Sequence, residues 1–399
     1  MNTTPLVTLP LTGPNDSVRT TILPPLDGPD GEQTPLSADP RPRFAVVGSL
    51  GQGGIGEVFA ADDRDIGRRV AIKRLRPDRR SDTTVARFVQ EVRTVGQLDH
   101  PNIVPLHDIG REDDGGFYLV MKYIDGETVE SLIERLKSGD RLAHQHWTFE
   151  RRVALFIQVL HAVQFAHDRG IVHRDLKPAN VMVGRHGEVH VVDWGLAKRL
   201  GAPDASATTL AGDVGPVGAS TETRAGALIG TPRYMAPEQA RGEPADVRTD
   251  TWALSLLFYE LLTLSHYLDG TDDLHQVLDG VLHRPIPSPV RMWRHRTQPP
   301  VPAELGWFLV RGLERDPNRR FQSVAEMLER LEHRMDGEIE VSCAVTAQKW
   351  TLIQLLKLTD RHPVLTLLGW GALAVAVVVA FLGAIGFGAA AAGLVALTV

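Results

Sequence analysis

Short runs of apolar, β-prone residues recur between residues 44 and 124 and predict a sheet. Three of them cover residues 44–48, 51–59 and 69–73. A fourth, residues 117–124, has the length of a strand and is followed at once by an Asp-Gly pair, which is typical of turns. This part of the chain is therefore predicted to be β-rich.

One helix interrupts these strands. Residues 82–98 place four valine and phenylalanine side chains at helical spacing, with Glu91 beside that apolar face. Pro101 disfavours helix in His100, so we expect the helix to end there and another strand to start at Ile103 and Val104.

After residue 126 the apolar spacing becomes helical. Residues 150–169 repeat apolar positions every three or four residues and stop at Gly170. Residues 250–264 are almost continuously apolar, which predicts a buried helix. A last amphipathic stretch from Val324 to Leu331 is expected to close the folded region near residue 333.

Both ends of the chain depart from these patterns. Residues 1–42 are rich in Pro, Thr, Gly and Asp and are expected to be a disordered arm. Residues 335–362 form a linker whose leucines and Trp350 are flanked by Lys349, Lys357 and Arg361, and it fits either an interfacial helix on anionic lipid or a helix that caps the folded domain.

Residues 363–399 contain no charged residue. Because about 20 apolar residues cross a bilayer, this stretch predicts a transmembrane segment, either one helix or a tight hairpin. The basic residues before it predict that the folded domain lies on the cytoplasmic side of a cell membrane. Gly383, Gly388 and Gly393 leave association into a homodimer open.

Composition narrows the class of protein. The net charge of -6 argues against a nucleic-acid partner, and the single cysteine, Cys343, excludes an internal disulfide framework and fits a reducing compartment. The first residues lack a basic region followed by an apolar core, so we expect no cleaved secretory signal.

The residues best suited to chemistry lie between two apolar runs at residues 173–180. Asp175, Lys177 and Asn180 place a carboxylate, an ammonium and an amide at fixed offsets. The carboxylate can accept a proton from an attacking hydroxyl, the ammonium can neutralise a phosphoryl group and the amide oxygen can bind Mg²⁺.

Glycines mark a second site. Gly51, Gly53 and Gly56 allow a hairpin backbone to approach phosphates. The same spacing occurs in dinucleotide-binding folds, but there a helix should follow, whereas here Val58 continues a strand and a second β-rich run ends at Lys73. Glu91 is either a surface residue or the partner that holds Lys73 on the phosphates.

Taken in order, these motifs resemble eukaryotic-type Ser/Thr protein kinases. The run His-Arg-Asp-Leu-Lys-Pro-Ala-Asn at residues 173–180 resembles the catalytic loop of that family, and Asp193-Trp194-Gly195 stands where the family has Asp-Phe-Gly. With its apolar C-terminal segment the chain resembles bacterial membrane-anchored members. Trp194 keeps an aromatic ring but enlarges it, which leaves the packing of this element open.

The resemblance implies roles for particular residues. Asp175 would be the catalytic base, Lys177 would stabilise the γ-phosphoryl group, and Asn180 with Asp193 would hold Mg²⁺. The further residues that would surround ATP are Leu50, Gly51, Gly53, Gly56, Val58, Ala71, Lys73, Glu91, Met121, Lys122 and Ile124.

The region after residue 195 would act on protein substrates. Residues 196–230 are a long loop rich in small residues, and the following stretch, 230–238, resembles a substrate-docking segment in which Thr231 would touch Asp175 and Lys177. Glu238 would pair with Arg320, and Asp250 would brace the catalytic loop. The candidate phosphosites are Thr208, Thr209, Ser220, Thr221 and Thr223.

We therefore predict an α+β, bilobal protein-kinase fold followed by a membrane segment. The kinase domain would cover residues 43–334, with a β-rich N-lobe at 43–122 and an α-helical C-lobe at 126–334. It would use ATP and Mg²⁺ to phosphorylate Ser and Thr of protein substrates, including its own loop, at the inner membrane. The main alternative is a pseudokinase scaffold that binds nucleotide without transferring phosphate; a small-molecule phosphotransferase fits the docking segment less well.

Overall fold

The computed structural model describes residues 42–52, 56–76, 81–112, 116–199, 232–271, 273–288, 295–336, 338, 341, 343–363, 368, 370–372 and 374–378. It divides into two compact units, Met1–Leu331 and Glu332–Val399, which are considered separately below. The predicted arm and most of the long loop, together with Gly53, Thr231 and all five candidate phosphosites, lie outside the described residues.

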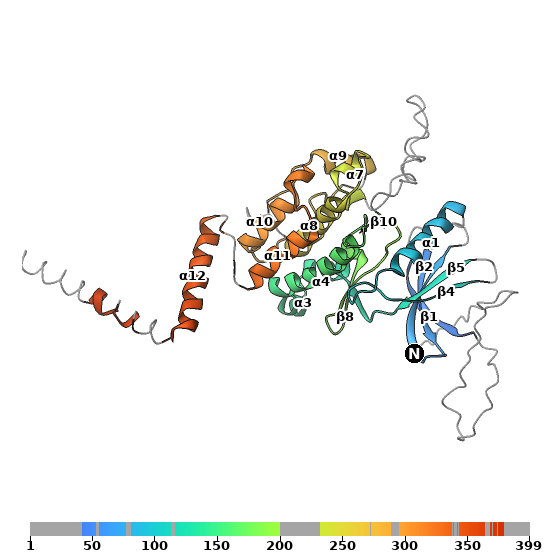
Figure 1. Ribbon diagram of the computed structural model, residues 1–399, viewed down its shortest axis with the longest axis horizontal. Helices are drawn as coiled ribbons and strands as arrows, with labels where there is room; N and C mark the ends of the chain where they lie inside the picture. Colours follow the sequence, from blue (N-terminus) through green and yellow to red (C-terminus); the bar gives the residue numbers. More distant parts are fainter. Residues whose placement is uncertain are drawn as a thin grey trace, which may run out of the picture. The chain divides into compact units, whose positions relative to one another are not determined.

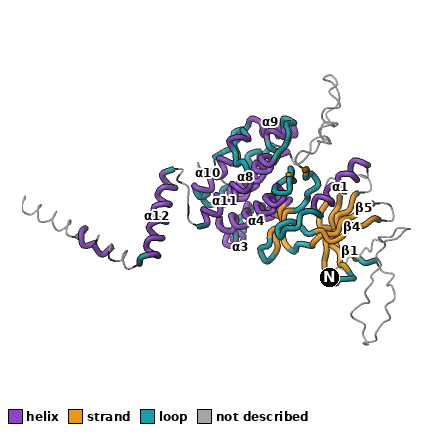
Figure 2. The backbone as a smooth tube through the Cα atoms, viewed as in Figure 1, coloured by secondary structure: helices purple, strands orange, loops and turns teal. Residues whose placement is uncertain are grey.

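The first unit begins with an antiparallel five-stranded sheet in the order β1-β2-β3-β5-β4 (Figures 1 and 2). Helix α1 packs on it through Phe88, which clusters with Leu75 and Leu119 of the sheet. The elements are β1 Phe44–Gln52, β2 Gly56–Asp63, β3 Arg68–Leu75, α1 Asp82–Val95, β4 Leu106–Arg111 and β5 Phe117–Lys122.

Helices dominate the rest of this unit. Nearly every residue of α8 is buried, as its continuous apolar sequence predicts, and α4 and α10 pack against it. The rings of Phe156 and Phe258 stack 4.1 Å apart between α4 and α8. The helices are α2 Val129–Lys137, α3 Arg141–His146, α4 Phe149–His167, α7 Pro237–Ala240, α8 Val247–Thr263, α9 Leu274–His283, α10 Ala303–Gly312 and α11 Val324–Met335.

The C-terminal end of α8 is capped by side chains from distant parts of the chain. Arg152 donates to the carbonyl of Leu261 at 3.2 Å, and Gln298 donates to that of Leu262 at 2.5 Å. Burial lowers the pKa of Arg152 to about 10. A cation at this position complements the negative end of the helix and satisfies a carbonyl that has no partner within the helix.

Short strands after α4 hold the candidate catalytic residues. Strands β6, β8 and β9 form one sheet, and β7 pairs with β10 in another. Helix α4 ends at His167, before the stop at Gly170 that the sequence predicts, and Gly170, whose φ is +71°, closes the turn that follows the helix. The remaining elements are β6 Gly126–Thr128, β7 Ile171–Val172, η2 Pro178–Asn180, β8 Val181–Gly184, β9 Val189–Val191, β10 Lys198–Arg199, η3 Pro232–Tyr234 and η5 Pro317–Arg319.

The strand predicted at Ile103 and Val104 was wrong in its position. Ile103 makes only an isolated parallel bridge to Val191, and the regular strand β4 begins at Leu106. Pro101 and Pro105 bracket this segment and lack the N–H group that a ladder requires, so pairing starts only after them.

The second unit contains α12, which spans Ala344–Arg361. Within the described part of the chain, we find no helix with the length and apolar character that a bilayer crossing requires. The predicted membrane segment, residues 363–399, lies largely outside the described residues and stays a prediction.

His266, which follows α8, is buried and makes stability depend on pH. Its Nδ1 accepts the N–H of Leu268 at 3.1 Å, which leaves the proton on the buried Nε2. Burial lowers its pKa from 6.5 to about 3. The folded protein therefore keeps this ring neutral while the unfolded chain binds a proton, and stability is lost as the pH falls from 6.5 toward 3.

We expect His266→Asn to weaken this dependence, because the asparagine oxygen can accept from Leu268 without titrating. The drop in unfolding free energy between about pH 7.5 and 5.5 should shrink by about 1 kcal/mol in urea titrations. The exposed His283 provides the control, since His283→Asn should leave the drop unchanged. An equal drop in His266→Asn and the unchanged protein would refute this assignment.

Candidate active site

Lys73 lies at the centre of one group of charges. Its Nζ is 2.6 Å from Oε1 of Glu91 and 2.9 Å from Oδ1 of Asp193. Strand β3 supplies the lysine, helix α1 the glutamate, and the turn after β9 the aspartate. The predicted Lys73–Glu91 ion pair is confirmed, whereas the contact between Lys73 and Asp193 was not foreseen.

These contacts keep Lys73 and Asp193 charged. Burial alone would lower the pKa of Lys73, but Glu91 and Asp193 outweigh it and the pKa is raised. Burial likewise opposes ionisation of Asp193, yet the ammonium of Lys73 prevails and the pKa of Asp193 is lowered. The group therefore presents one cation and a carboxylate at the same point.

We expect Glu91→Gln to lower kcat/KM for ATP by about 10- to 100-fold, the loss that follows when a charged hydrogen bond is weakened. The reason is that Lys73 would keep only Asp193 to orient it. Steady-state phosphate transfer at varied ATP concentrations measures the effect. Glu134, an exposed helical residue paired with Lys137, supplies the matched control Glu134→Gln. Equal kinetics of the two variants would argue against the orienting role.

The loop between β7 and β8 brings together the three residues singled out by the sequence. Lys177 Nζ lies 2.8 Å from Oδ2 of Asp175. The amide nitrogen of Asn180 donates to the carbonyl of Asp175 at 2.9 Å and to its Oδ2 at 3.2 Å. The carboxylate is thus held by two neighbours of its own loop.

Asp250 of α8 holds the backbone of this loop. It is fully buried, and its carboxylate accepts the N–H groups of His173 at 2.8 Å and Arg174 at 2.9 Å. Arg174 has a φ of +69°, a strained conformation for a side chain with a Cβ, which these bonds stabilise. The predicted bracing role of Asp250 therefore has a geometric basis.

Sequence reasoning missed His167 in α4. Its Nε2 lies 2.8 Å from Oδ2 of Asp250. Burial opposes ionisation of Asp250, but His167 and the backbone donors outweigh it and lower its pKa. The only sequence signal was a histidine near the end of the helix before the loop, which is too common to identify a role.

Asn180 and Asp193 provide oxygen atoms suited to Mg²⁺. Because the amide nitrogen of Asn180 is engaged by Asp175, its oxygen is oriented away from that residue. Asp193 has a φ of +60°, and one of its oxygens bonds Lys73. The described residues contain no cluster of three or more His, Cys, Asp or Glu side chains that could hold a metal. Two hard oxygen ligands fit Mg²⁺ shared with substrate phosphates.

Trp194 fits into the interior despite its size. Its side chain is 1 % exposed, belongs to the same core cluster as Val95 and Leu98, and lies 4.5 Å from the ring of His173. Its Nε1 has no hydrogen-bond partner among the described residues. The core therefore accommodates the larger ring while the adjacent Asp193 contacts Lys73, and this is the packing of Trp194 that the sequence left open.

Apart from Glu91 on α1 and Gly53, which lies outside the described residues, the residues predicted to surround ATP lie on β1, β2, β3, β5 and the segment after β5. In the sheet register, Gly51 pairs with Val58 and Ala71 with Met121. A Cβ added at Gly51 would meet nothing within 4 Å, so the backbone there is open to a ligand, as is the half-exposed Leu50. At Gly56 the packing of the strands requires a glycine, because a Cβ there would lie 2.6 Å from the carbonyl of Arg74.

Lys122 ends β5, and its N–H donates to the carbonyl of Pro105 at 3.0 Å, so this N–H is already engaged within the protein. No described backbone carbonyl accepts from Ile124 N–H. The side chain of Lys122 is directed to His190, 3.1 Å away, which the sequence did not predict.

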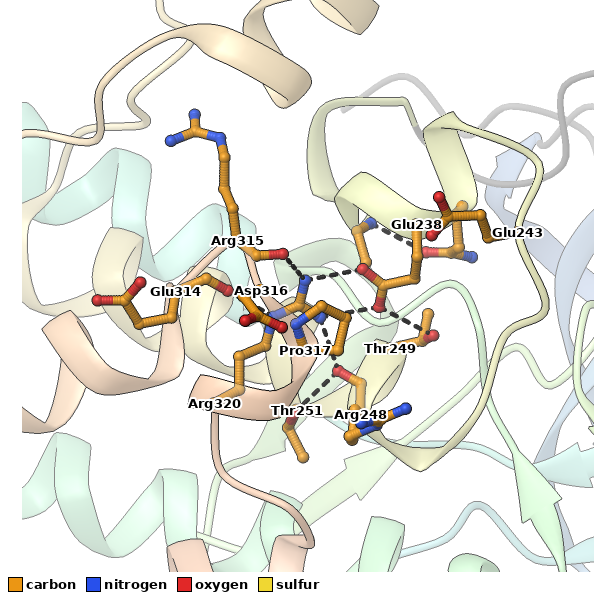
Figure 3. Close-up of polar contacts among 12 residues, drawn as sticks. Glu238, Glu243, Arg248, Thr249, Thr251, Glu314, Arg315, Asp316, Pro317 and Arg320 are labelled. Carbon is orange, nitrogen blue, oxygen red and sulfur yellow. Dashed lines mark hydrogen bonds and ion pairs between the residues drawn. The ribbon is translucent and has the colours of Figure 1, made fainter.

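Glu238 and Arg320 form a buried ion pair (Figure 3). The two guanidinium nitrogens of Arg320 lie 2.8 Å and 2.7 Å from the carboxylate of Glu238. Its remaining donors reach the carbonyls of Arg248, Glu314 and Arg315, so all five N–H groups are used. The predicted pair is confirmed.

The sequence matches the family described as protein kinase domain over residues 44–333. Similar proteins include the serine/threonine-protein kinase PknD of Protochlamydia amoebophila, 33 % identical over 75 % of this chain and 30 % of the relative. Probable serine/threonine-protein kinases of Streptomyces coelicolor and Corynebacterium efficiens are 36 % and 34 % identical, over 74 % and 73 % of this chain and 40 % and 41 % of the relatives. The chain thus spans well under half the length of these relatives.

Proposed function

The chain belongs to the protein kinase family, and on that premise we propose that it transfers the γ-phosphate of ATP to Ser and Thr hydroxyls of proteins. The observation that carries the proposal is Lys73, whose Nζ lies 2.6 Å from Glu91 and 2.9 Å from Asp193. This arrangement gives ATP phosphates a fixed cation beside a metal-binding carboxylate.

The residues divide the chemical work. Asp175 accepts the proton of the substrate hydroxyl and orients its oxygen. Lys177, 2.8 Å from Asp175, neutralises charge on the transferred group, and Lys73 holds the α- and β-phosphates. Asn180 and Asp193 would hold Mg²⁺, which supplies charge neutralisation of the phosphates.

The choice of Ser and Thr rests on the relatives, which are described as serine/threonine-protein kinases. We extend the proposed phosphorylation to the chain's own loop, residues 196–230. The proposed acceptors there are Thr208, Thr209, Ser220, Thr221 and Thr223. Arg174, adjacent to the base in sequence, would engage such a phosphate.

The C-terminal residues are proposed to anchor the protein in a cell membrane with the kinase domain in the cytoplasm. The support is the 37-residue stretch 363–399, which has no charged side chain, together with the basic residues that precede it. Association of two copies through the glycines of this stretch is part of the same proposal.

The test is phosphate transfer by the full chain in detergent or vesicles. The full chain is incubated with ATP and Mg²⁺, with and without a mixture of general protein substrates. The phosphosites are then mapped by mass spectrometry. We expect phosphoserine and phosphothreonine on both the chain and the substrates, lost when the metal is chelated. Metal-dependent nucleotide binding without any phosphorylated product would overturn the proposal in favour of a scaffold.

A further inference from the structure

Helix α12 of the second unit carries several exposed apolar side chains. Val345, Leu352, Leu355 and Leu356 are each about half exposed, at 52 %, 58 %, 49 % and 55 %. Thr346 is the only buried residue of this helix, all of which is described. Exposed apolar area of this kind marks a binding surface.

Most of the exposed apolar residues share one side of the helix. At about 100° per residue, these four side chains and Leu358, which is 51 % exposed, fall within an arc of about 160°. The four charged residues, Lys349, Lys357, Asp360 and Arg361, all fall outside that arc. One side of the helix is therefore apolar and uncharged, and the other carries every charge together with Ile353 and Trp350.

The charges identify the partner. Three basic residues and one acidic residue give the helix a net charge of 3 − 1 = +2, in a chain whose net charge is -6. Trp350, which is 43 % exposed, lies among the basic positions, where an indole can sit at headgroup level. The uncharged stretch 363–399 begins two residues after the helix ends, so any membrane that holds it lies within reach of α12.

We propose that α12 lies on an anionic lipid surface, with Leu352, Leu355 and Leu356 immersed at the boundary between headgroups and acyl chains. The basic residues around this face pair with lipid headgroups. This inference rests on the proposed membrane location and adds a second contact, which would restrict how the kinase domain moves relative to the bilayer. Three basic residues favour an anionic surface by about 100-fold, at about fivefold each.

The chain allows a site-specific test because Cys343 is its only cysteine. In a Cys343→Ser background of the full chain, a spin label is placed through Leu352→Cys, through Leu356→Cys, or through Gln354→Cys as the control on the opposite side of the helix. Collision with oxygen, which concentrates in lipid, and with a nickel chelate, which stays in water, is measured in vesicles. One set is pure phosphatidylcholine and the other contains roughly 30 % phosphatidylglycerol.

We expect labels at 352 and 356 to be oxygen-accessible and nickel-protected in anionic vesicles, with the label at 354 accessible to nickel. Charge reversal at Lys349, Lys357 and Arg361 together should return 352 and 356 to water. Equal nickel access at all three positions in anionic vesicles would overturn the proposal. Protection of 352 and 356 from both reagents, regardless of lipid, would also overturn it, because protein would then cover the face.

Failure of this proposal can be told from failure of the proposed function. Retention of the unchanged protein on vesicles after an alkaline wash reports on residues 363–399 alone. Phosphate transfer in detergent reports on the active site alone. A chain that is retained and active but has its α12 face in water would refute only the surface contact.

Discussion

Replacement of Asp175 by Asn is expected to slow phosphate transfer by about 10²- to 10⁴-fold, the usual contribution of a general base. Asparagine keeps the shape of the side chain and can still accept from Lys177 and Asn180, which lie 2.8 Å and 3.2 Å from Oδ2. It cannot accept the proton of the attacking hydroxyl. The loss should therefore fall on kcat, with KM for ATP little changed.

Single-turnover transfer to a protein substrate measures this effect, with urea unfolding to confirm that the fold persists. The exposed Asp279, on α9, offers the matched change Asp279→Asn, which should retain full activity. If Asp175→Asn transferred phosphate at a rate near that of Asp279→Asn, Asp175 would not be the base, and the assignment of the loop would have to be revised.

Replacement of Arg320 by Met is expected to cost about 3–5 kcal/mol of unfolding free energy, because it leaves the carboxylate of Glu238 buried without its cation. Arg320 is 1 % exposed and Glu238 is 5 % exposed, so water cannot take the place of the lost partner. Thr249 alone, at 3.2 Å, would still donate to the carboxylate. For a domain of ordinary stability this is a large fraction of the total.

A double-mutant cycle separates the pair from its surroundings. Glu238→Gln should also destabilise, and the double variant Glu238→Gln with Arg320→Met should be less unstable than the sum of the two, because neither residue then leaves a buried charge. The partly exposed pair Arg311 and Glu326 is the control: Arg311→Met should cost under about 1 kcal/mol. Additive losses in the cycle would show that the two side chains act independently.

The Lys73–Glu91 pair shows how far sequence reasoning reaches. The sequence predicted a lysine on a strand, Lys73, a glutamate on a helix, Glu91, and an acid at the end of a later strand, Asp193. Their meeting depended on α1 packing on β3 and β5 through Phe88, which amphipathic spacing alone made plausible but did not place. The contact of Lys73 with Asp193 joins residues 120 positions apart and had no local signal.

Gly56 shows a requirement that the motif did not reveal. Its spacing predicts a close approach to phosphates, and that interpretation stays a prediction. The structure adds that a Cβ there would meet the carbonyl of Arg74 on β3, so close packing of the two strands also requires a glycine. Gly51, with open space around it, keeps the interpretation that the motif gave.

By itself the sequence determined most of the elements and the chemical groups of the loop: periodicity predicted the strands and helices, and the motif at residues 173–180 placed a carboxylate, an ammonium and an amide in one loop. These are local properties, set by side chains close together in the chain. Only the tertiary structure decided how His167 and Asp250 support that loop and how the side chain of Trp194 is buried. Burial and long-range hydrogen bonds depend on residues far apart in the sequence, so no local pattern encodes them.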